Sequence, residues 1–488
     1  MLAWRGIPYA APPIGKLRFR APRRVERWNG SRDCSRFGAA APQAFHGQFR
    51  GVPPDVPSSE DCLTLNVLTV DSGERQRRGK PVMVFIHGGG YAAGSSRDFS
   101  GQGEGFVRDG AVVYVSFNYR LGALGYLDMS RYGTRQQPFE NNLGLRDQVA
   151  ALRWVRENIR SFGGDPNRVT VFGESAGGNA VTTLMATPSA RGLFARAIAQ
   201  SAPPDAVYAP VITGQWAAEF VGFLRGRVAE PLSSADTSDL LRRAAASDLV
   251  AAALSLQIRV PDQYPGSFCL APVVDGEFLP ERPLAAFRAG RAHRIPLIIG
   301  TNEREGSIFR GRVDILPRSP ARIAALFERA PSDAREPMRR AYPGLPGRRA
   351  SADFGGDFGF WFPSLKVADF HSRYAEVHAY RFDFAPRLLR LMGLDATHGV
   401  EMFALFGTTD APLARAMTAF GGADLYARAG DRMRQNWLRF AKGEDIAKVW
   451  PAYREPSRET LIIDEADRVE SDPKAEQRLA WEAFIAGT

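Results

Sequence analysis

The chain has 488 residues, of which 44% are hydrophobic, and this is enough apolar material for a large buried core. Its formal net charge is +10, but the arginines that carry most of it are scattered, so we interpret them as solvated surface charge rather than as a face for nucleic acid or anionic lipid. The sequence contains no long apolar run, signal peptide, C-x-x-C or H-E-x-x-H motif. We therefore expect a cytoplasmic protein without a membrane span, a disulfide scaffold or a metal site.

Strands and helices alternate in the predicted secondary structure. Residues 6–30 are rich in proline and are expected to lie extended over a surface. Apolar residues at helical spacing predict a helix over 144–160, and helix-compatible sequence covers 179–186. Short runs rich in β-branched and aromatic residues predict the strands. These strands cover residues 60–68, 81–86, 111–118, 169–172, 195–201, 295–300, 376–382 and 460–463.

This order of elements predicts an α/β fold with a mostly parallel central sheet and helices on both faces. The run 81–86 is apolar almost throughout, as expected for a strand that is covered on both sides. Residues 205–265 are rich in alanine and leucine, so we expect a helical insertion above the carboxyl edge of the sheet. Residues 310–370 are expected to form a second helical layer. Without repeats or linkers, the whole chain, 1–488, is predicted to be one domain with insertions.

A G-x-S-x-G motif at 173–177 lies between a predicted strand and a predicted helix. A serine on so sharp a turn needs small neighbours, because the strand and the helix pass close to each other, and Gly173 and Gly177 supply them. The turn exposes the Ser175 hydroxyl at the edge of the sheet, as a catalytic nucleophile requires. The alternative is a turn that merely contains a serine, so the interpretation depends on finding partners for Ser175.

Acyl transfer needs a base for the nucleophile and an acid that orients the base. His398 lies late in the chain in a loop of small residues, 395–399, which favours it as the base. His87 ends a buried strand, so we expect it to make structural hydrogen bonds. The acid should follow a strand that lies between the serine and the histidine in sequence. Glu303 and Glu305 both satisfy this condition, and spacing does not choose between them.

Backbone N–H groups are candidates for stabilising the oxyanion of such a reaction. Gly88, Gly89 and Gly90 follow a buried strand and let main-chain N–H groups approach a substrate oxygen without obstruction by Cβ atoms. The N–H of Ala176 completes the set. Each donor is worth about 3 kcal/mol in the transition state. The alternative for the triple glycine is a flexible turn.

Several short motifs recur along nearly the whole chain. They are GIPYAAPP (6–13), LRFRAP (17–22), SEDCLTLN (59–66), HGGG (87–90), NYRLG (118–122), NLGLRDQ (142–148), FGGDP (162–166), GESAG (173–177) and PVVDG (272–276). With these motifs the chain resembles the type-B carboxylesterase/lipase family of α/β-hydrolases, which includes bacterial para-nitrobenzyl esterases, carbamate hydrolases and the cholinesterases. The resemblance implies the α/β-hydrolase fold and hydrolysis of carboxylic esters.

The resemblance also implies roles for particular residues. The family pattern G-x-N-x-x-E-G falls on 300–306 and implies that the acid is Glu305 and not Glu303. The pattern H-G-x-E falls on 398–401 and supports His398 as the base. The other implied positions are the oxyanion donors Gly89, Gly90 and Ala176, the supporting residues Glu174 and Ser201, and the structural ion pair of Arg18 with Glu60.

The chain departs from the family pattern in its first part. The first strands of the family normally precede GIPYAAPP, but only five residues precede it here, so we expect the leading hairpin to be missing. The family's disulfide partner for Cys62 would fall near residues 42–43, where there is no cysteine, and we predict no such bridge. The loop 44–60 lacks tryptophan and so offers no cation–π platform for choline. Cholinesterase activity is therefore not expected.

We predict a serine esterase that acts on uncharged carboxylic esters through an acyl-enzyme, with carbamates and aryl esters as further candidates. No cofactor is expected, and the expected partner is a small ester. One alternative is a non-catalytic adhesion or binding relative, which would not need the complete triad that this chain retains. Another is a lipase for long-chain esters, which would need a broad apolar mouth around 205–265.

Overall fold

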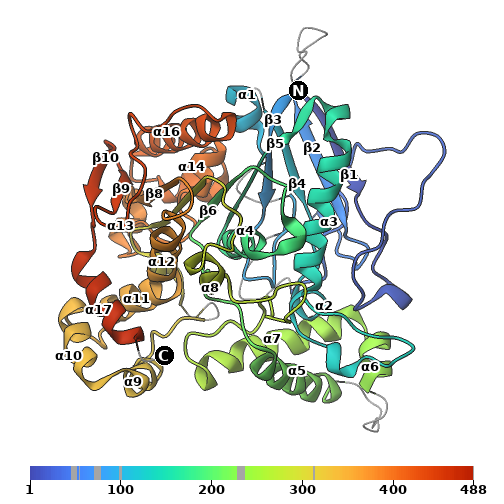
Figure 1. The fold of residues 1–488 in the computed structure, drawn as a ribbon, viewed down its shortest axis with the longest axis horizontal. Helices are drawn as coiled ribbons and strands as arrows, with labels where there is room; N and C mark the ends of the chain where they lie inside the picture. Colours follow the sequence, from blue (N-terminus) through green and yellow to red (C-terminus); the bar gives the residue numbers. More distant parts are fainter. Residues whose placement is uncertain are drawn as a thin grey trace.

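A mixed sheet of ten strands runs through the centre of the protein in a computed structural model that describes residues 1–44, 52–53, 55–70, 79–97, 102–110, 112–227, 237–310 and 314–486. The strand order is β1-β2-β4-β3-β5-β6-β7-β8-β9-β10 (Figure 1). The strands are β1 Leu2–Pro8, β2 Thr64–Thr69, β3 Lys80–Ile86, β4 Val113–Phe117, β5 Gly164–Glu174, β6 Arg196–Gln200, β7 Leu297–Asn302, β8 Val377–Phe382, β9 Glu459–Ile463 and β10 Arg468–Ser471.

Neighbouring strands from β4 to β9 are parallel, and only the pairs β1–β2, β2–β4 and β9–β10 are antiparallel. The predicted α/β fold with a mostly parallel central sheet is therefore confirmed. The expectation for residues 6–30 is wrong at its start, because residues 2–8 are not a strap but an edge strand. Gly6 N–H of this strand donates to Asn66 Oδ1 of β2 at 3.0 Å, next to a break in the register.

Helices cover both faces of the sheet and its carboxyl edge (Figure 1). They are α1 Glu104–Gly110, α2 Gly122–Tyr126, α3 Leu143–Asn158, α4 Ala176–Ala186, α5 Pro210–Arg225, α6 Thr237–Arg243, α7 Ala246–Gln263, α8 Pro283–Arg288, α9 Pro320–Arg329, α10 Ser332–Ala341, α11 Arg348–Gly356, α12 Phe362–His371, α13 Arg387–Leu391, α14 Met402–Phe406, α15 Pro412–Met417, α16 Ala423–Lys442 and α17 Ala475–Ile485. In Figure 1, α5 to α7 and α9 to α11 lie at the lower end, toward which the parallel strands point. Both stretches that were expected to be helical insertions thus contain helices at this edge.

Two hydrophobic cores lie on opposite faces of the sheet, because side chains alternate along a strand. In β3, Val82, Val84 and Ile86 belong to the core that includes residues of α3 and α4. Met83 and Phe85 of the same strand belong to the core with residues of α14 and α16. A strand with two buried faces reads as a continuous apolar run, which explains why β3 could be predicted from sequence.

The proline-rich segment after β1 is tied down by the ion pair that the resemblance implied. Arg18 Nε donates to Glu60 Oε2 at 2.8 Å. Its Nη1 also donates to the carbonyl oxygens of Arg242 and Ala244, at 2.7 and 2.8 Å, at the end of α6. Arg18 therefore joins this segment to the helical insertion. All three cysteines of the chain, including Cys62, are free thiols.

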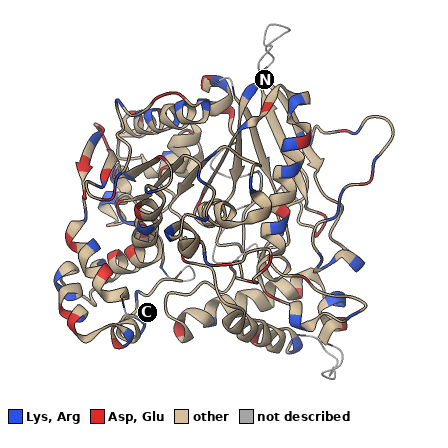
Figure 2. Ribbon diagram, in the orientation of Figure 1, with Lys and Arg blue, Asp and Glu red and all other residues tan. Residues whose placement is uncertain are grey.

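Charged residues of both signs are spread over the molecule in the view of Figure 2, where blue and red segments are interspersed among tan ones. This distribution matches the interpretation of the arginines as dispersed surface charge. Among the helices of the described ranges, none has both the length and the hydropathy that a membrane crossing requires.

Candidate active site

The serine of the G-x-S-x-G motif lies at the turn from β5 into α4. Its backbone has φ 59° and ψ −122°, a strained conformation for a residue with a side chain. Two hydrogen bonds hold the turn: Ser175 N–H donates to Gln200 O, and Asn179 N–H donates to Ser175 O, both at 2.9 Å. A Cβ on Gly177 would lie 2.0 Å from the carbonyl oxygen of Ile86, so β3 approaches this turn closely. The sequence predicted a close approach of β5 and α4, and a Cβ on Gly173 would lie 2.6 Å from the carbonyl carbon of Gly177; the approach of β3 was not predicted.

Glu305 and His398 meet through a hydrogen bond, although 92 residues separate them in the chain. Glu305 begins a short 3-10 helix, Glu305–Ile308, directly after β7. Its Oε2 lies 2.5 Å from His398 Nδ1. Its Oε1 accepts from Ser201 Oγ and from the Asn302 N–H, each at 2.7 Å. A carboxylate only accepts hydrogen bonds, so Nδ1 carries a proton whether or not the ring is charged, and Nε2 carries a lone pair only when the ring is neutral.

The other ring nitrogen of His398 faces the serine turn. Nε2 lies 3.1 Å from Oε1 of Glu174, the residue that precedes Ser175. The contact meets the distance for an ion pair but not the geometry of a hydrogen bond, and Nε2 makes no hydrogen bond to a described residue. The structure thus brings Glu305, His398 and the serine turn together, with Nε2 of His398 beside the turn. Loose contacts between a nucleophile and its base are common in unliganded enzymes.

Carboxylates dominate the electrostatics around the histidine. Burial by itself lowers the pKa of His398, but the charges of Glu174 and Glu305, together with the Glu305 hydrogen bond, raise it to about 9. A third carboxylate, Glu401, is fully buried and accepts from Asn302 Nδ2 at 2.7 Å and from Gln200 Nε2 at 3.4 Å. Burial raises the pKa of Glu401, and the charge of Glu305 adds to this effect.

The predicted oxyanion donors belong to two segments that lie side by side. A Cβ on Gly88 would lie 3.1 Å from Ser175 Cβ, so the glycine run adjoins the serine. Gly89 and Gly90 have φ values of 102° and 62°, which favour glycine. Ala176 opens α4, and the N–H groups of a first helical turn have no acceptor within the helix. Within the described chain, the N–H groups of Gly89, Gly90 and Ala176 donate no hydrogen bond that would occupy them.

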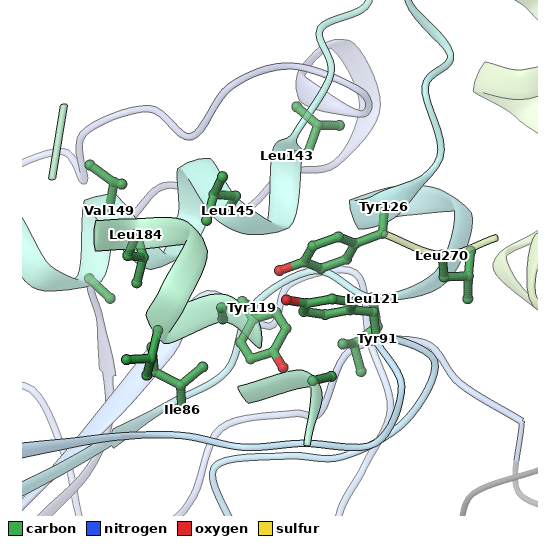
Figure 3. Close-up of a cluster of buried hydrophobic side chains, with 14 of the residues drawn as sticks. Ile86, Tyr91, Tyr119, Leu121, Tyr126, Leu143, Leu145, Val149, Leu184 and Leu270 are labelled. Carbon is green, nitrogen blue, oxygen red and sulfur yellow. The ribbon is translucent and has the colours of Figure 1, made fainter. Parts of the chain in front are cut away.

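A buried aromatic cluster supports the glycine run (Figure 3). Tyr91, the residue after the run, stacks on Tyr126 with ring centroids 3.8 Å apart and donates through its hydroxyl to Asn179 Oδ1 at 2.6 Å. His87 stacks on Tyr119 at 4.4 Å, and its Nδ1 lies 3.0 Å from Gly88 O. Burial lowers the pKa of His87 to about 4, so this ring stays neutral. The structural role predicted for His87 is confirmed.

Two aromatic rings that sequence reasoning did not select cover His398. Phe309 and Phe360 lie 5.2 and 4.6 Å from the histidine ring, measured between centroids. Phe360 belongs to a π-helical turn, Asp357–Trp361, between α11 and α12. Such turns occur often at functional sites. The two rings exclude water from one side of the imidazole, and no local sequence pattern identified them.

A buried arginine next to the acid joins three segments around the site. Arg304 donates to Asp395 of the histidine loop at 2.6 Å and to Asp353 of α11 at 2.7 Å. Its backbone N–H donates to Ala396 O at 3.0 Å. It therefore fixes the loop of His398 against the loop of Glu305. Sequence reasoning missed Arg304, because its partners are distant in the chain.

Other residues that were considered as candidates lie apart from this arrangement. Glu303 is exposed and lies close to Arg381 and Asp383, not to His398. His46 falls outside the described residues. In the part of the chain that the structure describes, no group of three or more histidine, cysteine or acidic side chains could hold a metal ion. The structure therefore places the pair of Glu305 and His398 beside the turn of Ser175, and the glycine run next to the same serine.

Comparison with known proteins agrees with this geometry. The sequence profile of the carboxylesterase family matches residues 1–481. The chain is 35% identical to the para-nitrobenzyl esterase of Bacillus subtilis (strain 168), over 97% of this chain and 94% of that protein. It is 31% identical to the phenmedipham hydrolase of Pseudarthrobacter oxydans, over 97% and 93%. Its structure is similar to that of a thermophilic para-nitrobenzyl esterase, with a TM-score of 0.84, 34% identity and coverage of 98% of this chain and 95% of the other.

Proposed function

Because the chain belongs to the carboxylesterase family, we propose that it hydrolyses uncharged carboxylic esters through an acyl-enzyme on Ser175. The observation that carries this proposal is the pairing of His398. Its Nδ1 is held by Glu305 at 2.5 Å, and its Nε2 lies 3.1 Å from the carboxylate of Glu174, next to the strained serine. A base held on one side with its lone pair toward a nucleophile is the arrangement that acyl transfer needs.

In the acylation half, His398 Nε2 accepts the proton of the Ser175 hydroxyl while Oγ attacks the ester carbonyl carbon. The carbonyl oxygen becomes an oxyanion, which the N–H groups of Gly89, Gly90 and Ala176 stabilise. His398 then returns the proton to the leaving alcohol oxygen as its bond to the carbonyl carbon breaks. Ser175 is left acylated, and the alcohol departs.

In the deacylation half, a water molecule replaces the alcohol. His398 takes a proton from the water, whose oxygen attacks the acyl carbon and forms a second oxyanion at the same N–H groups. The bond to Ser175 Oγ breaks, Oγ regains its proton from His398, and the acid departs. Glu305 keeps the imidazole oriented in both halves, and its charge stabilises the imidazolium that forms.

The ester chemistry is tested by a Ser175→Ala variant and a panel of para-nitrophenyl esters of increasing acyl length, with a phenylcarbamate included. We expect Ser175→Ala to reduce kcat by a factor on the order of 10⁴–10⁶. Ser130→Ala is a matched control, because Ser130 is exposed and lies outside this arrangement. A Ser175→Ala variant that retains most of its ester turnover would contradict the proposal.

Carbamates are a second substrate class that we propose for the same site. One relative that matches over almost its whole length is named phenmedipham hydrolase, a carbamate hydrolase. A carbamate has the same carbonyl geometry and needs the same nucleophile and oxyanion donors. Turnover of the phenylcarbamate by the parent protein, and its loss in Ser175→Ala, is the expected result.

A further inference from the structure

A second cavity lies behind the aromatic wall of the candidate active site. It has a volume of about 530 Å³, within the range of about 300–1,000 Å³ that is usual for ligand pockets. None of the residues proposed for catalysis lines it. It is bounded by the loop after β6, the start of α12, the end of α9 and the last described residues of the chain, 484–486.

The cavity lies one layer of side chains away from the catalytic histidine. Phe268 lines the cavity and packs against the apolar cluster that contains Phe309 and Phe360. Gly359, which also lines the cavity, precedes Phe360 in the π-helical turn. Phe309 and Phe360 in turn contact the ring of His398. The cavity and the catalytic site therefore share a wall but not their lining.

Most of the cavity wall is apolar and aromatic. Phe362, Phe370 and Phe484 are buried, with 5%, 7% and 4% of their surfaces exposed. Leu326 and Phe358 complete this part of the lining. A wall of this kind favours an alkyl or aryl group, at roughly 25 cal/mol for each Å² of apolar surface removed from water.

The positive and negative charges of the residues that line the cavity do not balance. The acids Asp205 and Glu482 are paired, the first with Arg282 at 2.8 Å and the second with Lys366 at 3.5 Å. Two further arginines, Arg288 and Arg329, also line the cavity. After these pairs are formed, the lining keeps an excess of positive charge.

Arg288 and Arg329 supply this excess. Neither forms an ion pair with a carboxylate of the described chain. The Arg288 guanidinium lies 5.1 Å from the ring centroid of Phe370, on the same ring that Lys366 approaches at 5.2 Å. A guanidinium that stacks on an aromatic ring keeps its N–H fork available for a carboxylate. The cavity thus offers an aromatic interior together with solvent-exposed guanidinium groups that no carboxylate of the described residues neutralises.

We propose that this cavity binds an amphipathic carboxylate, with the apolar chain among Phe358, Phe362 and Phe484 and the carboxylate on Arg288 and Arg329. The site is separate from the catalytic pocket, so its occupation does not depend on the proposed ester chemistry. Its aromatic wall is continuous with the one that covers His398, so a bound chain lies close to the catalytic site without entering it.

The proposal is tested by titrating decanoate and the uncharged decanol into the protein and measuring heat. We expect decanoate to bind at least about tenfold more tightly than decanol, because charge-assisted hydrogen bonds to guanidinium stabilise only the anion. Arg288→Gln and Arg329→Gln should each weaken decanoate binding about tenfold and leave decanol binding unchanged. Both arginines are exposed, so these variants keep the fold, and para-nitrophenyl acetate turnover should stay at the parent level.

Arg153→Gln is the matched control, because Arg153 is exposed on α3, away from the cavity. It should bind decanoate like the parent. The protein phosphorylated on Ser175 by a small organophosphate should also bind decanoate unchanged. Equal affinity for decanol and decanoate, or parent-like decanoate affinity in both cavity variants, would overturn the proposal. Loss of decanoate binding on phosphorylation of Ser175 would also overturn it, since decanoate would then occupy the catalytic pocket.

Discussion

Replacing Glu174 by glutamine removes the carboxylate charge beside the free nitrogen of His398 and keeps the shape of the side chain. Glu174 Oε1 lies 3.1 Å from Nε2 of the histidine. Its negative charge favours the protonated imidazole and, with Glu305, holds the pKa of His398 at about 9 against the opposing effect of burial. In Glu174→Gln this attraction is lost, and the pKa of His398 should fall.

The size of this fall follows from the distance. Two unit charges 3.1 Å apart attract each other by about 1.3 kcal/mol even in a medium as polar as water. This energy corresponds to about one pKa unit. The surroundings of His398 are less polar than water, so a fall of one pKa unit is the lower bound. His398 acts as a base only when deprotonated, so kcat/KM falls as pH falls through its pKa. A lower pKa moves this fall to lower pH.

The assay is the pH dependence of kcat/KM for para-nitrophenyl butyrate, corrected for spontaneous hydrolysis, because this ratio reports the pKa of the free enzyme. We expect the acidic limb of Glu174→Gln to lie about one pH unit or more below that of the parent. Glu303→Gln removes an exposed carboxylate that follows β7 and does not contact His398, and it should leave the limb in place. A Glu174→Gln variant that folds and keeps the parent's limb would refute the reasoning.

Two further predictions concern residues that hold the acid and the base. Ser201→Ala removes a hydrogen bond of 2.7 Å to Glu305. It should lower kcat for a short neutral ester about tenfold with little change in KM. An unchanged kcat would show that Ser201 does not support the acid. Arg304→Ala removes the hydrogen bonds to Asp395 and Asp353, although Asp395 keeps Arg349 at 3.1 Å, and should lower the free energy of unfolding by about 2 kcal/mol in urea denaturation. A variant as stable as the parent would contradict the role of Arg304 as a joint between the two loops.

The fold could be predicted from sequence where a strand is buried on both faces. The residues of β3 are apolar almost without interruption, and β4 and the buried second half of β5, residues 169–172, follow a similar pattern. The strand β10 lacks this signal, because Arg468–Ser471 forms the edge of the sheet and has no buried residue. The strand β1 was missed for a related reason: it is an edge strand whose first residues are exposed. Edge strands depend on a partner that sequence periodicity does not reveal.

The site could be predicted in part, because its local motifs have steric causes. The glycine beside the serine is required by β3, whose Ile86 carbonyl leaves no room for a Cβ at Gly177. No pattern in the neighbouring sequence indicates the roles of Arg304 and Phe360. Their roles arise only when distant segments meet at the histidine, one through an ion pair to Asp395 and the other through ring contact. Tertiary contacts of this kind cannot be predicted from the sequence pattern of either segment.

Ser175 is the proposed nucleophile, and mass spectrometry of the protein after reaction with a fluorophosphonate is the sharpest test of this role. We expect one phosphonate adduct for each chain, located on the peptide that contains Ser175, with loss of ester turnover in proportion to labelling. The Ser175→Ala variant should carry no adduct. Labelling of another serine, or full ester turnover in protein whose Ser175 is completely labelled, would contradict the claim.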